Sequence, residues 1–353
     1  MIFIRADANS VIATGHIMRC MAIANQLKKQ GEQVIFLVAD EYPADMLIEN
    51  GFSYIVLHTD WNDMESELLL LKELIQEYEV CVLFVDSYQV SELYFTELSK
   101  AVKVIYLDDR NAFPYDVSEI INYSHYYRDF EYEKVYGASD VKLWLGCEYI
   151  PLREEFCEME QKDISEYIQN VMITTGGTDR YHVSDLVLEM LSKQYPDIVF
   201  HMVVGRFFDN ADRLQALAEE RKNVKLYERI AKMSALMSEC DIAISAGGTT
   251  LYELCAAGIP TICFSVADNQ VRGIKAMKEQ DIMLAAGDIR NGGEIFGKRL
   301  MMNFDRLQDR KVRLAYSRRM QDLVDGKGAE RIARILSRSG SYLFEKKELR
   351  FST

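Results

Sequence analysis

The sequence lacks several features that would assign it to common classes of protein. No apolar run reaches the length that spans a membrane, and the start lacks the basic-then-apolar layout of a signal peptide. Lysine and arginine number 41 against 55 aspartate and glutamate residues, which gives a net charge of −14. This acidic balance argues against nucleic acid and against an anionic membrane surface as partners. We therefore expect a cytoplasmic protein that does not insert into membranes.

Cysteine and histidine are also sparse. The seven cysteines are odd in number and have no paired spacing, which is typical of reduced thiols in a cytoplasm. The five histidines show no metal-ligand spacing. We therefore expect no metal site and no cofactor, and the sequence leaves the oligomeric state open.

Two series of alternating strand and helix signals make up most of the 353 residues. In the first series, strand-like runs occupy residues 2–4, 34–38, 54–57, 80–86, 102–109 and 120–122. In the second, they occupy residues 171–177, 198–205, 224–227, 241–248 and 261–266. Such alternation predicts parallel sheets covered by helices on both faces. The pattern lapses at about residues 152–168, so we expect one domain over 1–155, a second over 156–339 and a tail over 340–353.

The first strand-to-helix turn carries a candidate catalytic residue. Gly15 and His16 lead from the first strand into a helix, at the carboxyl end of the strand, where ligands bind in open α/β sheets. The positive end of a helix dipole favours a neutral imidazole, which can act as a general base. A lone histidine near a helix start is also commonly a cap or a surface residue, so position alone leaves both interpretations open.

Two glycine turns in the second half are candidate phosphate loops. Gly247 and Gly248 end a buried-type strand, and a helix is expected to begin at about Thr249, followed by Thr250. Glycines let a phosphate approach the backbone, and a helix start offers free N–H groups to an anion. Glu253 lies one helical turn further on, and its carboxylate suits paired ribose hydroxyls. The alternative is a tight turn with a solvated glutamate.

The second glycine turn, at Gly176, Gly177 and Thr178, follows the strand that opens the second domain. It is either a plain turn or a further phosphate-facing loop. The paired acids Asp108 and Asp109 end another strand, and we expect them to be solvated because no third metal ligand accompanies them.

These motifs carry a resemblance to a known family. The spelling Arg5-x-Asp7 followed by Gly15-His16 resembles the start of the UDP-2,4-diacetamido-2,4,6-trideoxy-β-L-altropyranose hydrolases of pseudaminic acid synthesis, which are related to spore-coat polysaccharide proteins. Members of that family usually have Gly-x-Gly-His at this turn, whereas this sequence has Ala13 at the position of the first glycine. The string from Ile244 to Pro260 resembles the UDP-binding helix of GT-B glycosyltransferases and of the same hydrolases.

The resemblance implies a fold and a set of site residues. The implied fold is GT-B, in which two doubly wound, Rossmann-like parallel-sheet domains face each other across a cleft. Tyr88 is implied to lie beside the sugar, Ile230 to pack its backbone on uracil, and Asn269 to point into the cleft. The full expected set is His16 as the catalytic residue, with Arg5, Asp7, Gly15, Tyr88, Gly176, Gly177, Thr178, Ile230, Gly247, Gly248, Thr249, Thr250, Glu253, Asn269 and Gln270 binding substrate.

The implied activity is hydrolysis of a UDP-diacetamido-trideoxyhexose. His16 would activate water for attack at the anomeric carbon, with inversion and release of UDP. Two alternatives stay open: an inverting GT-B glycosyltransferase in which His16 deprotonates an acceptor hydroxyl, and a non-catalytic nucleotide-sugar binding protein. The expected partner is a small UDP-sugar, whose sugar the sequence does not identify.

Overall fold

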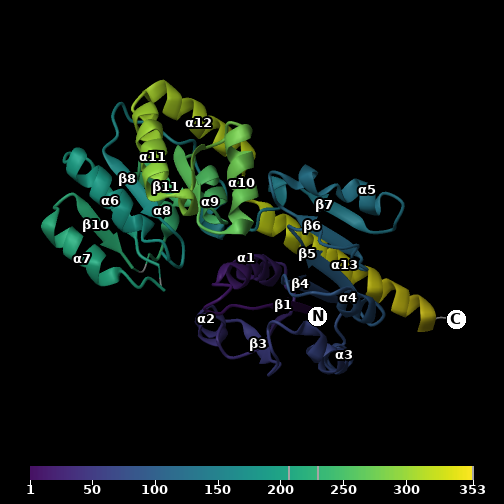
Figure 1. The fold of residues 1–353 in the computed structure, drawn as a ribbon. Helices are drawn as coiled ribbons and strands as arrows, with labels where there is room; N and C mark the ends of the chain where they lie inside the picture. The colour runs from purple at the N-terminus through teal and green to yellow at the C-terminus, as the bar shows by residue number, and fades with distance from the viewer. Residues whose placement is uncertain (206, 229, 352–353) are drawn as a thin grey trace. The chain divides into compact units, whose positions relative to one another are not determined.

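The computed structural model describes residues 1–205, 207–228 and 230–351, with side chains described as far as Ser339. The chain divides into two compact units, one formed by Met1–Arg153 with Lys327–Thr353 and the other by Glu154–Gly326. Each unit is a parallel sheet with helices (Figure 1). The expected GT-B pattern of two doubly wound sheets is therefore confirmed at the level of each unit.

The first unit contains a seven-stranded sheet with strand order β3-β2-β1-β4-β5-β6-β7. Its strands are β1 (Ile2–Ala6), β2 (Val34–Val38), β3 (Ser53–Val56), β4 (Val82–Asp86), β5 (Lys103–Leu107), β6 (Glu119–Asn122) and β7 (Lys142–Leu145). Its helices are α1 (Gly15–Lys29), α2 (Ala44–Glu49), α3 (Leu68–Glu77), α4 (Glu92–Ser99), α5 (Tyr132–Tyr136) and α13 (Gly328–Phe351), with 3-10 turns η1 (Met64–Glu67), η2 (Tyr127–Phe130) and η3 (Cys147–Tyr149). The strand order reverses between β1 and β4.

The second unit contains a six-stranded parallel sheet with strand order β10-β9-β8-β11-β12-β13. Its strands are β8 (Asn170–Thr174), β9 (Val199–Val203), β10 (Val224–Tyr227), β11 (Ile242–Ala246), β12 (Thr261–Ser265) and β13 (Leu284–Asp288). Its helices are α6 (Val183–Gln194), α7 (Ala211–Glu220), α8 (Met233–Glu239), α9 (Thr250–Ala256), α10 (Asp268–Glu279), α11 (Gly293–Leu307) and α12 (Arg310–Leu323), with 3-10 turns η4 (Glu154–Phe156) and η5 (Ile289–Asn291). Here the order reverses between β8 and β11.

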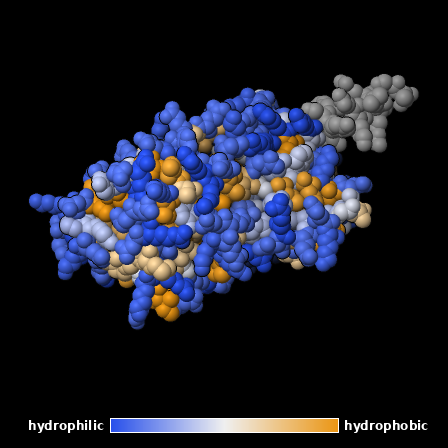
Figure 2. Space-filling view, turned by 90° about the horizontal axis from the view of Figure 1, so that it is seen from above, coloured by the Kyte–Doolittle hydropathy of each residue, from blue (hydrophilic) through white to orange (hydrophobic). Residues whose placement is uncertain are grey.

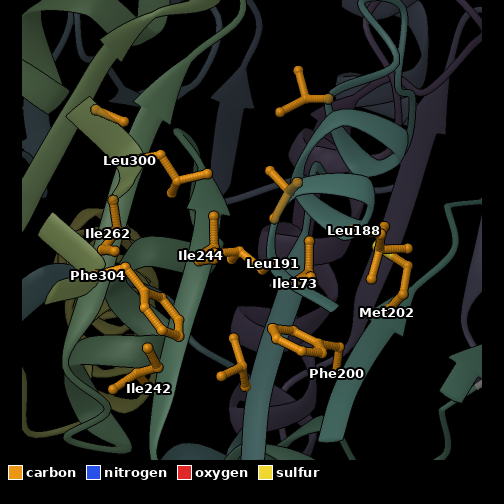
Figure 3. Close-up of a cluster of buried hydrophobic side chains, with 14 of the residues drawn as sticks. Ile173, Leu188, Leu191, Phe200, Met202, Ile242, Ile244, Ile262, Leu300 and Phe304 are labelled. Carbon is orange, nitrogen blue, oxygen red and sulfur yellow. The ribbon is translucent and has the colours of Figure 1, made fainter. Parts of the chain in front are cut away.

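The core of the second unit shows why its strands are apolar throughout. Side chains from β8 and β11, such as Ile173 and Ile244, pack with Leu191 of α6 and Phe304 of α11 (Figure 3). All four are fully buried. Because helices cover both faces of a parallel sheet, its strands need no polar face. Burying each such side chain contributes about 1.5–3 kcal/mol.

Helix α13 returns to the first unit, and this differs from the expected domain limits. The sequence suggested that the second domain runs to residue 339, but α13 packs against α1 of the first unit. Arg331 donates to the Glu148 carbonyl at 2.9 Å, and Ser337 donates to Gln30 Oε1 at 2.8 Å. The apolar Ile332 and Leu336 are buried, which explains the attachment. The expected tail falls largely within this helix, which ends at Phe351, and residues 352–353 lie outside the described part.

The surface is predominantly hydrophilic on the face drawn in Figure 2, where apolar residues form small patches separated by polar side chains. None of the helices in the described part of the chain is both long and apolar enough to cross a membrane.

Candidate functional site

The first candidate site lies where the strand order of the first unit reverses. Strands β1 and β4 are parallel neighbours, and Ala6 pairs in register with Asp86. The loops that follow both strands therefore leave the sheet side by side at its carboxyl edge. Ligands of open α/β sheets bind at such a reversal point.

The loop after β1 places His16 at the second position of α1. Asn9 Oδ1 accepts hydrogen bonds from the backbone N–H groups of Val11 and Ile12, at 2.8 and 3.0 Å. Asn9 N donates to the Ala13 carbonyl at 3.3 Å. Ala13 has φ of 56°, in the left-handed region that favours glycine. The alanine thus adopts the backbone conformation that the related family's glycine would adopt freely.

Replacing Ala13 by glycine is expected to raise the free energy of unfolding by about 0.5–1 kcal/mol. Left-handed backbone costs a non-glycine residue about 1–2 kcal/mol, and the greater freedom of glycine in the unfolded chain offsets about 0.4–1 kcal/mol of this gain. Urea denaturation measures the change. Ala138→Gly is the control, because exposed Ala138 has no positive φ and its replacement should lower stability. Unchanged or lower stability for Ala13→Gly would contradict the assigned strain.

His16 forms a buried pair with Asp86. Its Nδ1 lies 2.7 Å from Asp86 Oδ1, and the two residues are 8% and 1% exposed. Burial by itself would raise the pKa of Asp86, but the Arg19 guanidinium and His16 outweigh it and hold that pKa well below its usual range. Arg19 Nη2 also lies 3.0 Å from Nδ1, but the contact with ionised Asp86 is shorter and requires a proton on Nδ1, so we assign the lone pair of His16 to Nε2. Catalytic histidine bases are oriented by a carboxylate in the same way.

Arg19 completes this cluster from the next turn of α1. Residues three apart on a helix share a face, so Arg19 and His16 both reach Asp86. Arg19 Nε donates to Asp86 Oδ2 at 2.6 Å, its Nη2 donates to Asp86 Oδ1, and its Nη1 donates to Tyr123 Oη at 2.5 Å. Burial opposes the charge of Arg19, but Asp86 raises its pKa well above the usual value. The guanidinium therefore fixes both the charge and the orientation of Asp86.

Tyr88 lines the pocket beside His16. Its ring lies edge-on to the His16 imidazole, with 4.9 Å between centroids. Its hydroxyl donates to Asp109 Oδ2 at 2.8 Å. Burial and then Asp109 raise the pKa of Tyr88 well above the usual value, so the phenol stays protonated.

The expectation that both paired acids are solvated is wrong for Asp108, which is 1% exposed. Its carboxylate accepts from the backbone N–H groups of Arg110 and Asn111 at 3.0 and 2.8 Å and from the Tyr132 hydroxyl. These bonds shape the loop after β5. Among the residues that the structure describes, no group of three or more His, Cys, Asp or Glu side chains is placed to hold a metal ion.

The structure gives Arg5 a place that does not suit substrate binding. Arg5 is fully buried in β1, where Nε and Nη2 donate to Glu67 at 2.9 Å and Nη1 donates to Asp7 Oδ2 at 2.6 Å. Tyr94 also donates to Glu67, at 2.7 Å. Asp7, by contrast, lines the pocket beside His16. The expectation that Arg5 binds substrate is therefore wrong. Its guanidinium instead holds the Asp7 carboxylate in position.

The second candidate site uses the corresponding reversal point of the second unit. Gly176, Gly177 and Thr178 follow β8 and are all exposed. Gly205 packs directly beneath, since a Cβ there would lie 2.3 Å from the Gly176 carbonyl oxygen. Asp179 is buried and accepts from the backbone N–H of Val183 at 2.9 Å, which fixes the start of α6.

The loop after β11 is the partner of this turn. Gly248 is exposed with φ of 144°, and no atom lies near the position of a Cβ. Gly247 lies against Gln270, whose Oε1 accepts from the Val266 N–H at 2.8 Å. Thr249 makes no side-chain cap to α9, which begins at Thr250.

Glu253 lies in the first turn of α9 and is half-buried. The two glycine turns follow β8 and β11, which are parallel neighbours, so both turns lie at the same edge of the sheet. Asn269 is exposed near the start of α10, which begins at Asp268 with Ala267 as its N-cap residue. Ile230 is half-buried between β10 and α8. Among the described residues, no hydrogen bond links the side chain of Asn269 or Ile230 to the glycine turns.

Several residues at the first site were missed from the sequence. They are Asp86, Arg19 and Tyr123 in the ion-pair cluster, and Ile12, Trp61, Ser87 and Gln89 in the adjoining pocket. The available signal was the acid that ends the apolar strand β4. Asp86 lies next to His16 only because β4 is the neighbour of β1 in the sheet. The order of the strands along the chain does not predict that they are neighbours.

Comparison with known proteins supports the predicted resemblance. Residues 170–272 match the glycosyltransferase family 28 C-terminal domain. The chain is 24% identical over 351 residues to the spore coat polysaccharide biosynthesis protein SpsG of Bacillus subtilis, covering 94% of this chain and 96% of that protein. It is 26% identical over 269 residues to the UDP-2,4-diacetamido-2,4,6-trideoxy-beta-L-altropyranose hydrolase of Campylobacter jejuni, covering 74% and 91%. The resemblance is thus confirmed at modest identity.

Two further comparisons concern length and fold. An uncharacterized protein of Methanocaldococcus jannaschii, MJ1062, is 26% identical over 272 residues, and the match spans only 54% of that relative's length. The solved structure of MurG from Acinetobacter baumannii is similar with a TM-score of 0.69 at 13% identity, covering 96% of this chain and 99% of that one. At such identity the likeness shows the fold, and the chain has the GT-B fold.

Proposed function

We propose that this chain, a GT-B protein related to the altropyranose hydrolases and to SpsG, is an enzyme that hydrolyses a UDP-sugar. The proposed substrate is a UDP-diacetamido-trideoxyhexose of the pseudaminic acid type, and the products are UDP and the free sugar. The observation that carries the proposal is the buried His16–Asp86 pair at the reversal point of the first sheet. Its free Nε2 is suited to take a proton from water.

The proposed reaction is a displacement at the anomeric carbon. His16 Nε2 accepts a proton from water as the water oxygen forms a bond to that carbon. The bond between the carbon and the UDP oxygen breaks, and UDP leaves with the electron pair. Ionised Asp86 stabilises the imidazolium that forms. Attack from the side opposite UDP inverts the anomeric centre.

The proposed UDP site lies on the second unit. Exposed Gly176, Gly177 and Gly248 and half-buried Thr249 follow the paired strands β8 and β11, and we assign the diphosphate to the backbone N–H groups of these turns. Glu253 suits the ribose hydroxyls, because a carboxylate accepts two hydrogen bonds. We keep Ile230 as the proposed uracil contact, and Asn269 and Gln270 as proposed substrate contacts. The family 28 match over residues 170–272 supports a nucleotide-sugar role for this unit.

Incubation with a panel of UDP-diacetamido sugars in heavy-oxygen water tests the proposal. We expect UDP release without any acceptor, label in the anomeric hydroxyl of the sugar, and inversion observed by NMR before mutarotation. Label in the UDP phosphate would place the attack on phosphorus and contradict the mechanism. UDP release only with an added acceptor would identify a glycosyltransferase, and binding without turnover would identify a binding protein.

A further inference from the structure

A small pocket adjoins His16 in the first unit. Its lining residues come from the loops after β1, β3 and β4, from the start of α1 and from the end of β4, and they are Asp7, Ile12, His16, Trp61, Asp86, Ser87, Tyr88 and Gln89. The cavity volume is about 10 Å³. A cavity needs roughly 10–15 Å³ to hold one water molecule. The pocket is therefore of the size of a single water molecule.

The polar groups of the pocket can hold a water molecule. His16, Asp7 and Ser87 come from three segments and are 8%, 5% and 9% exposed. Asp7 Oδ1 accepts from the Ala39 N–H at 2.8 Å and its Oδ2 accepts from Arg5, and each carboxylate oxygen can accept a second hydrogen bond. The Ser87 hydroxyl accepts from the Gln89 N–H at 3.2 Å and still has its own proton to donate. A buried water needs two to four polar partners, and these three groups supply them.

Half-buried apolar side chains also line the pocket, which stays partly open to solvent. Ile12 belongs to the loop that Asn9 shapes, and Trp61 belongs to the segment after β3. The Tyr88 ring, held by its bond to Asp109, adds a third apolar wall. An alcohol carries a carbon substituent on its oxygen and needs more room than the one-water volume of the pocket provides.

We propose that this pocket, which we call the water pocket, selects water over alcohols as the nucleophile. The inference rests on the proposed function and adds what decides between hydrolysis and transfer to an acceptor. Asp7 and Ser87 orient the water, whose proton goes to His16 Nε2 as its oxygen bonds to the anomeric carbon and UDP leaves. Trp61 and Ile12 are the specificity-determining residues, because they exclude any nucleophile larger than water.

Methanol competition tests the selection. The full chain is incubated with the UDP-sugar in aqueous methanol, and free sugar and methyl glycoside are quantified together with UDP. The wild-type protein should yield free sugar with almost no methyl glycoside. Trp61→Ala makes room for the methyl group and should raise the ratio of methyl glycoside to free sugar by on the order of tenfold or more, the usual range for one carbon in a fitted pocket. Methanol loses its hydroxyl proton to His16, as water does.

Matched variants test whether a change in the ratio of methyl glycoside to free sugar comes from the pocket itself or from a general destabilisation of the first unit. Ile12→Ala opens the same pocket from another loop and should shift the ratio in the same direction, which keeps the test available if Trp61→Ala fails to fold. Trp61→Phe retains an aromatic wall and should shift it less. Tyr42→Ala removes an exposed aromatic side chain outside the pocket and should leave the ratio unchanged.

The outcomes separate the two proposals. UDP release with methyl glycoside formed by the wild type in proportion to the methanol present would overturn the selection and leave hydrolysis intact. An unchanged ratio in folded, active Trp61→Ala and Ile12→Ala variants would overturn it as well. Absence of UDP release from every UDP-sugar in the panel would overturn the proposed function, and the selection with it.

Discussion

Replacing His16 by asparagine is expected to lower turnover by roughly 10²–10⁴-fold, the usual contribution of a positioned general base. Asparagine can still bond to Asp86, but it has no basic nitrogen to accept the proton of water. The dissociation constant of UDP should change little, because the proposed nucleotide contacts belong to the second unit. Steady-state kinetics and calorimetric titration with UDP measure the two effects separately.

Two control variants sharpen this result. His58 is exposed in the same unit with φ of 55°, a conformation that asparagine tolerates well, so His58→Asn should keep full turnover. Glu253→Ala should show the opposite split, with UDP affinity weakened by roughly 1–3 kcal/mol. Near-normal turnover of the His16 variant would remove the base from the mechanism, whatever its effect on binding.

The position of His16 could be predicted because the signals for it are local. An apolar run, a break of small polar residues and a helical pattern follow one another within twenty residues, and the structure has β1, a loop and α1 there. The same is true of the glycine turns after β8 and β11. The edge strands β7 and β13 were missed, because β7 is only partly buried and β13 reads LAAGD, with small residues of weak strand preference.

The partners of these local elements could not be predicted, because they depend on pairing across long separations. Asp86 lies seventy residues from His16 along the chain, and the two meet only because β4 lies beside β1. Arg5 was expected to bind substrate because it belongs to the Arg5-x-Asp7 pattern that carries the resemblance to the hydrolase family. Its buried partner Glu67 comes from a turn 62 residues later. Helix α13 crosses back to the first unit in the same way, and no linear boundary describes that.

Replacing Asp86 by asparagine is expected to lower turnover by about 10²–10⁴-fold and also to destabilise the first unit. An amide can donate to His16 Nδ1, and that bond favours the tautomer whose proton sits on Nε2, where the base is needed. Buried Arg19 would lose its charged partner, which typically costs about 3–5 kcal/mol. Turnover is measured below the melting temperature of the variant, with urea denaturation alongside. Asp40→Asn, which alters a carboxylate just after β2, serves as the control.

The pH dependence of this destabilisation distinguishes an ionised Asp86 from a neutral one. Its pKa in the folded protein lies below the unfolded value of about 3.9, so its stabilising contribution is fully present above about pH 5 and is lost as pH falls through the folded value. The gap in unfolding free energy between wild type and Asp86→Asn should therefore stay constant from about pH 5 to 8 and narrow only in strong acid. A gap that opened only as the pH rose through this range would mean that Asp86 is protonated in the folded protein. Such a carboxyl group could not orient His16 as a base.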